Sequence, residues 1–155
     1  MTTRYVAVVG PGETASDADL AAARAAGRLL AEAGAIVLTG GLGGVMAAAT
    51  QGADAAGGLT VALLPGTDRS VSAAAVVIPT GLGELRNALL VRAADAVIAV
   101  GGSWGTLSEI ALAQRTGVPV VCLGGWELRD ATGAPAELPR ADTVEDAVRI
   151  ALDRR

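Results

Sequence analysis

Two charged side chains in this sequence are placed where they could do chemistry. Glu109 follows the glycine-rich segment 101–106 (GGSWGT) by about one helical turn, and Arg86 follows the segment 79–81 (PTG). A carboxylate can stabilise an oxocarbenium-like centre or orient a water molecule, and an arginine can bind two phosphate or ribose oxygens at once. Each also has a plainer interpretation, Arg86 as a solvated helix charge and Glu109 as a favourable acid near a helix N-terminus.

Three glycine-rich segments are expected at the ends of buried strands: residues 10–14 (GPGET), 39–46 (TGGLGGVM) and 101–106. Glycine lets the backbone approach a phosphate closely, and the helix that follows supplies unpaired N–H groups and a partial positive charge. Any one segment is equally consistent with a tight turn and nothing more. Three of them at one edge of a sheet favour a shared ligand site.

Missing residue types exclude several reaction classes. All twelve basic residues are arginine and there is no histidine. The absence of lysine excludes a Walker P-loop and any Schiff-base enzyme, including a pyridoxal-phosphate decarboxylase, and the absence of histidine excludes Ser-His and Cys-His catalysis. Zinc sites usually need several His or Cys ligands, so we expect no metal site. The only thiol, Cys122, is expected to be a small buried hydrophobe.

Charge and hydropathy limit the classes of binding partner that the sequence allows. The net charge is −4 and there is no basic run, which disfavours nucleic acid as a partner. No apolar stretch reaches membrane-spanning length, and the N-terminus runs directly into a strand-like segment without a signal peptide. One cysteine permits no intrachain disulfide. We therefore expect a cytoplasmic protein that does not contact membranes.

Short apolar segments alternate with longer Ala- and Leu-rich segments at helical spacing. The expected strands are residues 5–9, 36–38, 59–64, 75–78, 96–100 and 118–123. The expected helices are residues 17–33, 43–56, 82–94, 106–116 and 144–152. Ser16 with Asp19 resembles a capping box, and Thr143 is a further N-cap signal.

This alternation predicts an α/β fold: a three-layer, doubly wound parallel sheet, Rossmann-like, in a single domain over residues 1–155. Its ligands would bind beyond the carboxyl ends of the strands. The segment 126–140 is expected to be a surface loop or a short helix. A dinucleotide-binding enzyme is disfavoured, because the first turn lacks G-x-G-x-x-G and the second strand ends without an acid for the ribose.

The motifs resemble those of the Lonely Guy (LOG) superfamily, once misnamed lysine decarboxylases. Members carry P-G-G-x-G-T-x-x-E, which matches residues 101–109 (GGSWGTLSE), and an upstream Arg-Lys pair, which matches Arg86-Asn87. Residues 40–46 resemble the G-G-x-x-G-L-M turn of the superfamily. The resemblance spans about residues 6–123 and implies a nucleotide-binding Rossmann-like fold. Well-known members are phosphoribohydrolases, which cleave the N-glycosidic bond of nucleoside 5′-monophosphates.

The resemblance also implies roles for individual residues. Glu109 would stabilise charge at the anomeric carbon or position water, Arg86 would orient ribose and phosphate, and both would be catalytic in an enzyme. Phosphate would be cradled by Gly102, Gly105 and Thr106. The full set of residues expected at the ligand and its phosphate is Gly10, Gly12, Thr14, Gly40, Gly41, Gly43, Gly44, Met46, Arg86, Asn87, Gly101, Gly102, Ser103, Gly105, Thr106 and Glu109.

Three departures from the motif point to a sister branch. Gly101 replaces the proline of the motif, Ser103 replaces a glycine and Asn87 replaces the lysine. In these respects the chain is more similar to molybdenum cofactor carrier proteins. Those proteins bind a phosphorylated pterin and need not hydrolyse it. A carrier for a nucleotide or a molybdopterin-type ligand, with no required cofactor, is the first hypothesis, and a phosphoribohydrolase is the alternative. A pure scaffold has no need of three glycine-rich strand ends. The resemblance further implies a homo-oligomer, a dimer or a tetramer.

Overall fold

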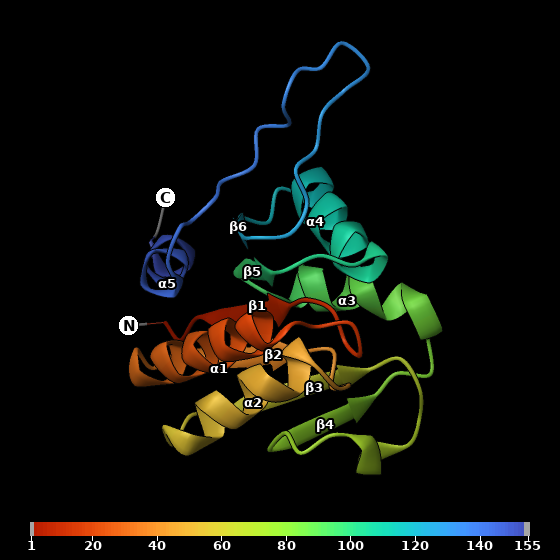
Figure 1. Ribbon diagram of the computed structural model, residues 1–155. Coiled ribbons are helices and arrows are strands. Elements are labelled where there is room, and N and C mark those ends of the chain that lie inside the picture. Colours follow the sequence, from red (N-terminus) through yellow and green to blue (C-terminus); the bar gives the residue numbers. More distant parts are fainter. Residues whose placement is uncertain (1, 154–155) are drawn as a thin grey trace.

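A single parallel sheet organises the computed structural model, which describes residues 2–153. Within these residues the sheet has six strands in the order β4-β3-β2-β1-β5-β6 (Figure 1). The strands are β1 (Tyr5–Val9), β2 (Ile36–Thr39), β3 (Thr60–Leu64), β4 (Val76–Pro79), β5 (Ala96–Val100) and β6 (Val120–Leu123). The strand order reverses between β1 and β5, which is the switch point of a doubly wound sheet.

Helices cover both faces of this sheet, as the apolar runs predicted. One face carries α1 (Asp17–Glu32), α2 (Val45–Ala55) and α5 (Val144–Leu152). The other face carries α3 (Arg86–Ala93) and α4 (Trp104–Thr116). Short 3-10 turns, η1 (Arg69–Val71) and η2 (Gly83–Leu85), flank β4 and α3. The three-layer, Rossmann-like fold is therefore confirmed.

Strands β1 and β5 form the centre of the core because both of their faces are buried. In β1, Val6 and Val8 pack on the side of α1, whereas Ala7 and Val9 pack on the side of α3 and α4. All of β5 is buried. Cys122 is buried in β6, as its apolar neighbours predicted, and this burial raises the pKa of its thiol.

Both predicted helix caps are present. The Ser16 hydroxyl accepts a hydrogen bond from the Asp19 amide at 3.1 Å, and the Asp19 carboxylate accepts one from the Ser16 amide at 3.1 Å, which completes a capping box. Thr143 accepts a hydrogen bond from the Asp146 amide at 3.1 Å. These bonds fix the starts of α1 and α5 at the predicted residues.

The segment 126–140 is an irregular excursion and not a helix. It leaves the body of the molecule beyond β6 and returns before α5 (Figure 1). Its base is fastened by Arg140, which donates hydrogen bonds to the Trp126 oxygen at 2.8 Å and to the Gly124 oxygen at 3.1 Å. Within residues 2–153 we find no helix with the length and apolarity that crossing a membrane requires.

Helices α1 and α2 touch backbone to backbone at two glycines. A Cβ atom on Gly27 would lie 2.0 Å from the Ala49 oxygen, and one on Gly52 would lie 1.9 Å from the Arg24 oxygen. Real Cβ atoms do not approach an oxygen so closely, so the crossing needs glycine on both helices. The close approach lets two helices share the face over β1 and β2.

We expect Gly27→Ala to lower the free energy of unfolding by about 1–3 kcal/mol, because the added methyl forces α1 and α2 apart. The matched control is Gly66→Ala, where no atom lies within 4 Å of the new methyl. The control should change stability by less than about 1 kcal/mol. Urea denaturation of both variants measures the difference, and equal stability of the two would contradict the crossing.

Candidate functional site

A cavity of about 550 Å³ opens at the carboxyl edge of the sheet, beside the switch point. The loops after β1, β2 and β5 and the start of α3 enclose it, as the strand-end rule predicts. The lining residues are Gly10, Gly12, Glu13, Leu42, Gly43, Met46, Arg86, Asn87, Ser103, Gly105, Thr106 and Glu109.

The loops after β1 and β2 are held against each other by their backbones. A Cβ on Gly10 would lie 2.4 Å from the Val100 oxygen, so only glycine fits between the ends of β1 and β5. Gly44 has φ +64°, and a Cβ there would lie 2.1 Å from the Gly12 oxygen. The Val45 amide donates a hydrogen bond to the Pro11 oxygen at 3.0 Å. The start of α2 is thereby fixed beside the first loop.

Helix α4 points its N-terminus at the cavity. Ser103 is its N-cap, and the Ser103 hydroxyl accepts a hydrogen bond from the Thr106 amide at 3.2 Å. The same hydroxyl lies 2.9 Å from the hydroxyl of Thr106, which is buried. The first amides of a helix have no acceptor inside it, which leaves those of Trp104 and Gly105 for a ligand. Together with the helix dipole they favour an anionic group.

Arg86 is buried and held by the ends of two strands. Its side chain donates hydrogen bonds from Nη1 to the Gly40 oxygen at 2.5 Å and to the Leu63 oxygen at 2.7 Å, and from Nε to Asn87 Oδ1 at 3.1 Å. Only 7% of the residue is exposed. Desolvation lowers the pKa of Arg86, although Glu109 opposes this. The plainer interpretation of Arg86 as a solvated helix charge is therefore wrong.

Glu109 is the second buried charged group and has no hydrogen-bond partner. It is 7% exposed and lines the cavity, and within residues 2–153 no donor bonds its carboxyl group and no ion pair joins it to Arg86. Burial raises the pKa of Glu109 to about 7, partly offset by the charge of Arg86. The partial loss of hydration disfavours the charged form of this carboxyl group, while its position in the cavity lining leaves it accessible to a ligand.

A short chain of hydrogen bonds joins α3 to α4 at the cavity wall. Asn87 donates from its side-chain amide to the Ser108 hydroxyl at 3.0 Å, and that hydroxyl donates to the Gly105 oxygen at 2.7 Å. Asn87 thus replaces the motif's lysine with a neutral side chain that fixes the position of α4. The Arg86–Asn87 pair therefore joins β2, β3, α3 and α4.

The structure brings most of the predicted residues together. The predicted residues that line the cavity are Gly10, Gly12, Gly43, Met46, Arg86, Asn87, Ser103, Gly105, Thr106 and Glu109. The predicted residues outside its lining are Thr14, Gly40, Gly41, Gly44, Gly101 and Gly102. Most of the second group face protein: a Cβ on Gly41 would lie 2.4 Å from Leu64, and one on Gly101 would lie 2.8 Å from Asp19.

Two lining residues were not predicted. Glu13 and Leu42 line the cavity, and both are exposed. Each lies inside a glycine-rich segment that the sequence predicted at the ligand site, but neither side chain was predicted to line it. Their residue types carried no signal, because an exposed acid and an exposed leucine are common in loops. Within residues 2–153 no three His, Cys, Asp or Glu side chains gather as metal ligands would.

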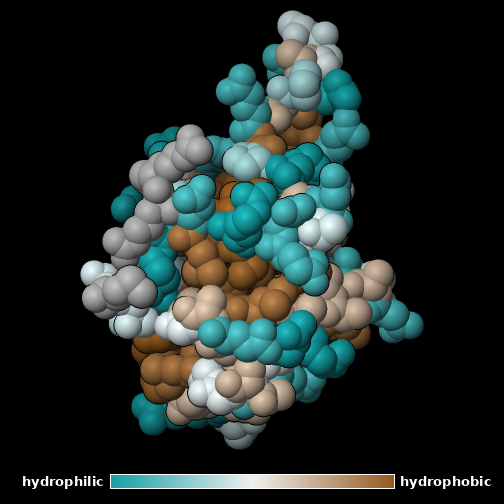
Figure 2. All heavy atoms as spheres, turned by 90° about the vertical axis from the view of Figure 1, so that its left-hand side faces the viewer, coloured by the Kyte–Doolittle hydropathy of each residue, from teal (hydrophilic) through white to brown (hydrophobic). Residues whose placement is uncertain are grey.

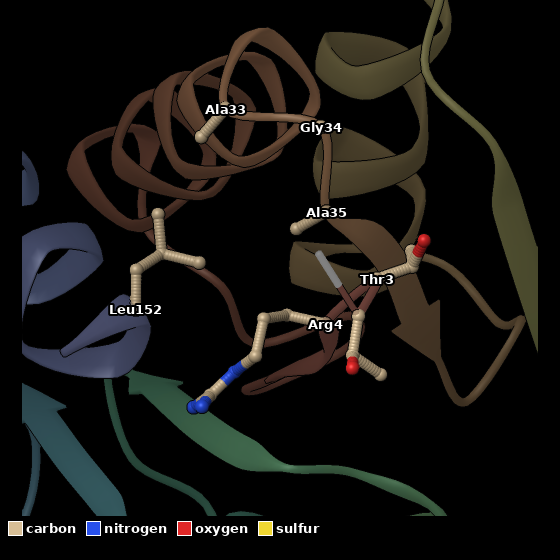
Figure 3. Close-up of a pocket in the computed structure, with 7 residues that line it drawn as sticks. Thr3, Arg4, Ala33, Gly34, Ala35 and Leu152 are labelled. Carbon is tan, nitrogen blue, oxygen red and sulfur yellow. The ribbon is translucent and has the colours of Figure 1, made fainter. Parts of the chain in front are cut away.

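A second cavity, of about 660 Å³, lies at the opposite edge of the sheet (Figure 3). Apolar side chains gather in the middle of that edge (Figure 2). Among the described residues of its lining, Arg4 alone is charged, and it donates a hydrogen bond to the Ala151 oxygen near the end of α5 at 3.0 Å. A cation at a helix C-terminus has a structural explanation. We therefore place the candidate site at the carboxyl edge.

Fold and cavity define a class: Rossmann-like α/β proteins with a polar pocket at the switch point of a parallel sheet. The chain belongs to the SLOG cluster4 family, whose model matches residues 3–148. The resemblance to the LOG superfamily predicted from the motifs is thereby confirmed. An uncharacterized protein of Archaeoglobus fulgidus is 43% identical over 124 residues, which are 79% of this chain and 82% of that protein.

Two solved structures are similar over nearly the whole chain. The molybdenum cofactor binding protein of Rippkaea orientalis is 36% identical with a TM-score of 0.87, covering 97% of this chain and 96% of that one. The molybdenum cofactor carrier protein of Chlamydomonas reinhardtii is 33% identical with a TM-score of 0.84, covering 96% and 95%. Within the superfamily, the chain is therefore similar to the cofactor carrier branch, as the motif departures predicted.

We expect Glu109→Gln to stabilise the protein at about pH 8 by roughly 2–3 kcal/mol and to have little effect near pH 5. Because the pKa of Glu109 is about 7 when folded and its ordinary value is 4.5, the folded state binds the proton more tightly. Stability from this group is therefore present at low pH and lost as pH rises through about 7. Glutamine, which never ionises, removes that loss.

Thermal or urea unfolding of both proteins at the two pH values measures this effect. The control is Glu137→Gln, an exposed glutamate outside the cavity, which should change stability by less than about 0.5 kcal/mol at either pH. A pH-independent difference between wild type and Glu109→Gln would show that Glu109 is not a buried, unpaired carboxyl.

Proposed function

We propose that this protein binds a phosphorylated, nucleotide-like ligand in the switch-point cavity and acts as a binding or carrier protein. The ligand is a nucleotide or a molybdopterin-type cofactor. The observation that carries the proposal is the meeting of two helix starts with one largely buried carboxyl group, that of Glu109, which receives no hydrogen bond from residues 2–153. This arrangement suits a molecule with an anionic end and hydrogen-bond donors nearby.

The anionic end is best accommodated by the backbone. The unpaired amides at the start of α4, and those that follow Val45 in the first turn of α2, provide donors and favourable dipoles. Gly43, in front of α2, lines the cavity and has open space where a side chain would be. The backbone can therefore approach a phosphate closely there. Arg86 adds a positive charge to the same cavity.

The remaining part of the ligand would satisfy Glu109. A carboxylate accepts hydrogen bonds from ribose hydroxyls or ring N–H groups, and a neutral carboxyl can also donate one. Because the pKa of Glu109 is about 7, the group carries only part of a negative charge at neutral pH and repels a phosphate less than an ordinary carboxylate would. Glu109 and the helix starts can therefore serve one ligand.

The comparisons support a carrier over an enzyme. The structures similar to this chain are those of a molybdenum cofactor binding protein and a carrier protein. The sequence also departs from the hydrolase motif at Gly101, Ser103 and Asn87. Of these three residues, Asn87 donates a hydrogen bond to Ser108 of α4 and, being neutral, provides no positive charge for the ligand. We therefore favour binding without turnover.

A LOG-type phosphoribohydrolase is the alternative, and one observation favours it. Glu109, with a pKa of about 7, shares a buried cavity with Arg86. A carboxyl group that titrates near neutral pH suits acid–base work at a glycosidic bond. In that case Glu109 and Arg86 would be catalytic, as the family resemblance implies.

We expect Gly43→Asp to weaken binding of ribose 5-phosphate and AMP at least about 10-fold, because it places a carboxylate beside the phosphate. Gly43→Asn is the matched control, nearly equal in size but uncharged, and should retain binding within about 3-fold. Isothermal titration calorimetry measures both. Arg86→Ala is expected to weaken the same ligands. No binding of either ligand to the wild type would overturn the proposed function.

Release of free base decides between carrier and hydrolase. Wild-type protein is incubated with AMP and the products are separated by chromatography. We expect bound but intact AMP. Adenine release that disappears in Glu109→Gln would instead establish the phosphoribohydrolase.

We also propose that the protein self-associates through the α3 side of the sheet. On this side the register places Val76 and Ile78 of edge strand β4 beside Val61 and Leu63 of β3. Val76 is 42% exposed and Ile78 is 43% exposed, because α3 and α4 lie over the other strands. An uncovered apolar sheet face of this kind marks an interaction surface.

Helix α3 extends this surface and suits a second copy of the chain. Leu82 and Leu85, just before α3, and Leu89, within it, are also exposed. A standard interface buries about 800 Å² per partner, so these leucines would add to the area that β4 offers. Glu84 and Arg92 lie four residues either side of position 88. In a two-fold, antiparallel pairing of α3 with its copy, each glutamate would therefore face the partner's arginine.

We expect the double variant Ile78→Glu/Leu85→Glu to be monomeric and the wild type to be dimeric or larger, because two carboxylates cannot be buried in an apolar interface. The control is Leu59→Glu, at an exposed leucine before β3, which should leave the oligomer intact. Sedimentation velocity or multi-angle light scattering measures the mass. A monomeric wild type at about 100 μM would refute the interface.

A further inference from the structure

Two of the three aromatic side chains of the chain meet near the start of α4, beside the candidate site. The sequence contains only Tyr5, Trp104 and Trp126 as aromatics. The rings of Trp104 and Trp126 have centroids 5.0 Å apart and planes inclined by 44°. Tyr5 begins β1, at the amino ends of the strands and thus on the side of the sheet opposite the cavity. The two tryptophans therefore lie next to the start of α4, outside the lining of the cavity itself.

Trp126 is fixed to the backbone of the glycine-rich turn. Its indole N–H donates a hydrogen bond to the Ser103 oxygen at 2.9 Å. A Cβ on Gly102 would lie 3.0 Å from the indole Cδ1, so the ring lies directly against that glycine. Arg140 in turn holds the Trp126 oxygen at 2.8 Å. Trp126 therefore gives Trp104 a rigid support.

Trp104 itself remains in solvent despite this contact. It is 77% exposed, the largest exposed fraction among the large apolar side chains. Such exposure contributes little to the core, so packing does not explain a tryptophan at this position. Trp104 is the first residue of α4, and its neighbours Ser103 and Gly105 line the cavity. The backbone of Trp104 is thus next to the proposed phosphate site, and its indole lies just outside the cavity lining.

We infer that Trp104 stacks on the planar ring system of the bound ligand while the start of α4 holds its phosphate. The inference rests on the proposed function and narrows it to phosphorylated ligands with a flat, fused heterocycle, such as a purine or a pterin. Stacking tolerates different rings because each presents a π face. Trp126, by supporting Trp104, acts as a positioning residue.

The test compares ligands with and without a ring. AMP carries a purine, and ribose 5-phosphate carries the same sugar phosphate without it. Loss of one aromatic–base stack should weaken AMP binding to Trp104→Ala by about 5- to 150-fold. Binding of ribose 5-phosphate to the same variant should change by less than about 3-fold, because its phosphate contacts are backbone groups. Trp104→Tyr, which retains a ring, should restore most of the AMP affinity.

Fluorescence gives a second readout, because Trp104 and Trp126 are the only tryptophans of the sequence. AMP should quench the emission of the wild type more than that of Trp104→Ala, and ribose 5-phosphate should quench neither. The matched control for aromatic truncation is Tyr5→Ala, at the far edge of the sheet, which should leave both affinities unchanged.

The experiment distinguishes failure of the proposed function from failure of the stacking role of Trp104. If the wild type binds neither compound, the proposed function fails. If AMP and ribose 5-phosphate bind equally well, or if Trp104→Ala weakens both to the same extent, ligand binding stands and the stacking role of Trp104 is refuted.

Discussion

The candidate site depends on backbone segments that touch where the strands end. Gly10 lies against the end of β5, Gly44 lies against the loop after β1, and a Cβ on Gly125 would lie 2.0 Å from the Gly101 oxygen. A side chain at any of these positions would separate loops that must converge. Because they do converge, the starts of α2 and α4 open onto one cavity. The glycines therefore organise the site as much as they would contact a ligand.

Arg86 and Glu109, the two buried charged residues within residues 2–153, have different surroundings. Arg86 is satisfied by strand carbonyl groups, so its position is fixed before any ligand arrives. Glu109 receives no hydrogen bond and keeps its desolvation penalty, which raises its pKa to about 7. A largely buried carboxyl group with a raised pKa that opens onto a cavity is typical of functional sites.

The sequence located the strands well, but the helix expected from residue 82 is the turn η2 followed by α3 from Arg86, and the site was predicted only in part. Apolar runs located every strand to within two residues, because buried parallel strands need them. Strand order was not readable, since it depends on contacts between distant segments. The burial of Arg86 also escaped prediction, because its acceptors on Gly40 and Leu63 lie 46 and 23 residues away. Gly41 was predicted at the ligand but faces the protein interior, and Glu13 was not predicted but lines the cavity. A motif therefore predicts where a loop lies, but not which of its residues face the ligand.

The lack of histidine gives Glu109 an unusual value as a spectroscopic reporter. No imidazole titrates in the range around its pKa of about 7. The carbonyl stretch of a protonated carboxylic acid is separate from the amide bands of the backbone, so infrared difference spectra near neutral pH can follow this single proton. Occupancy of the cavity would then be visible in the native chain, without a label and without any substitution.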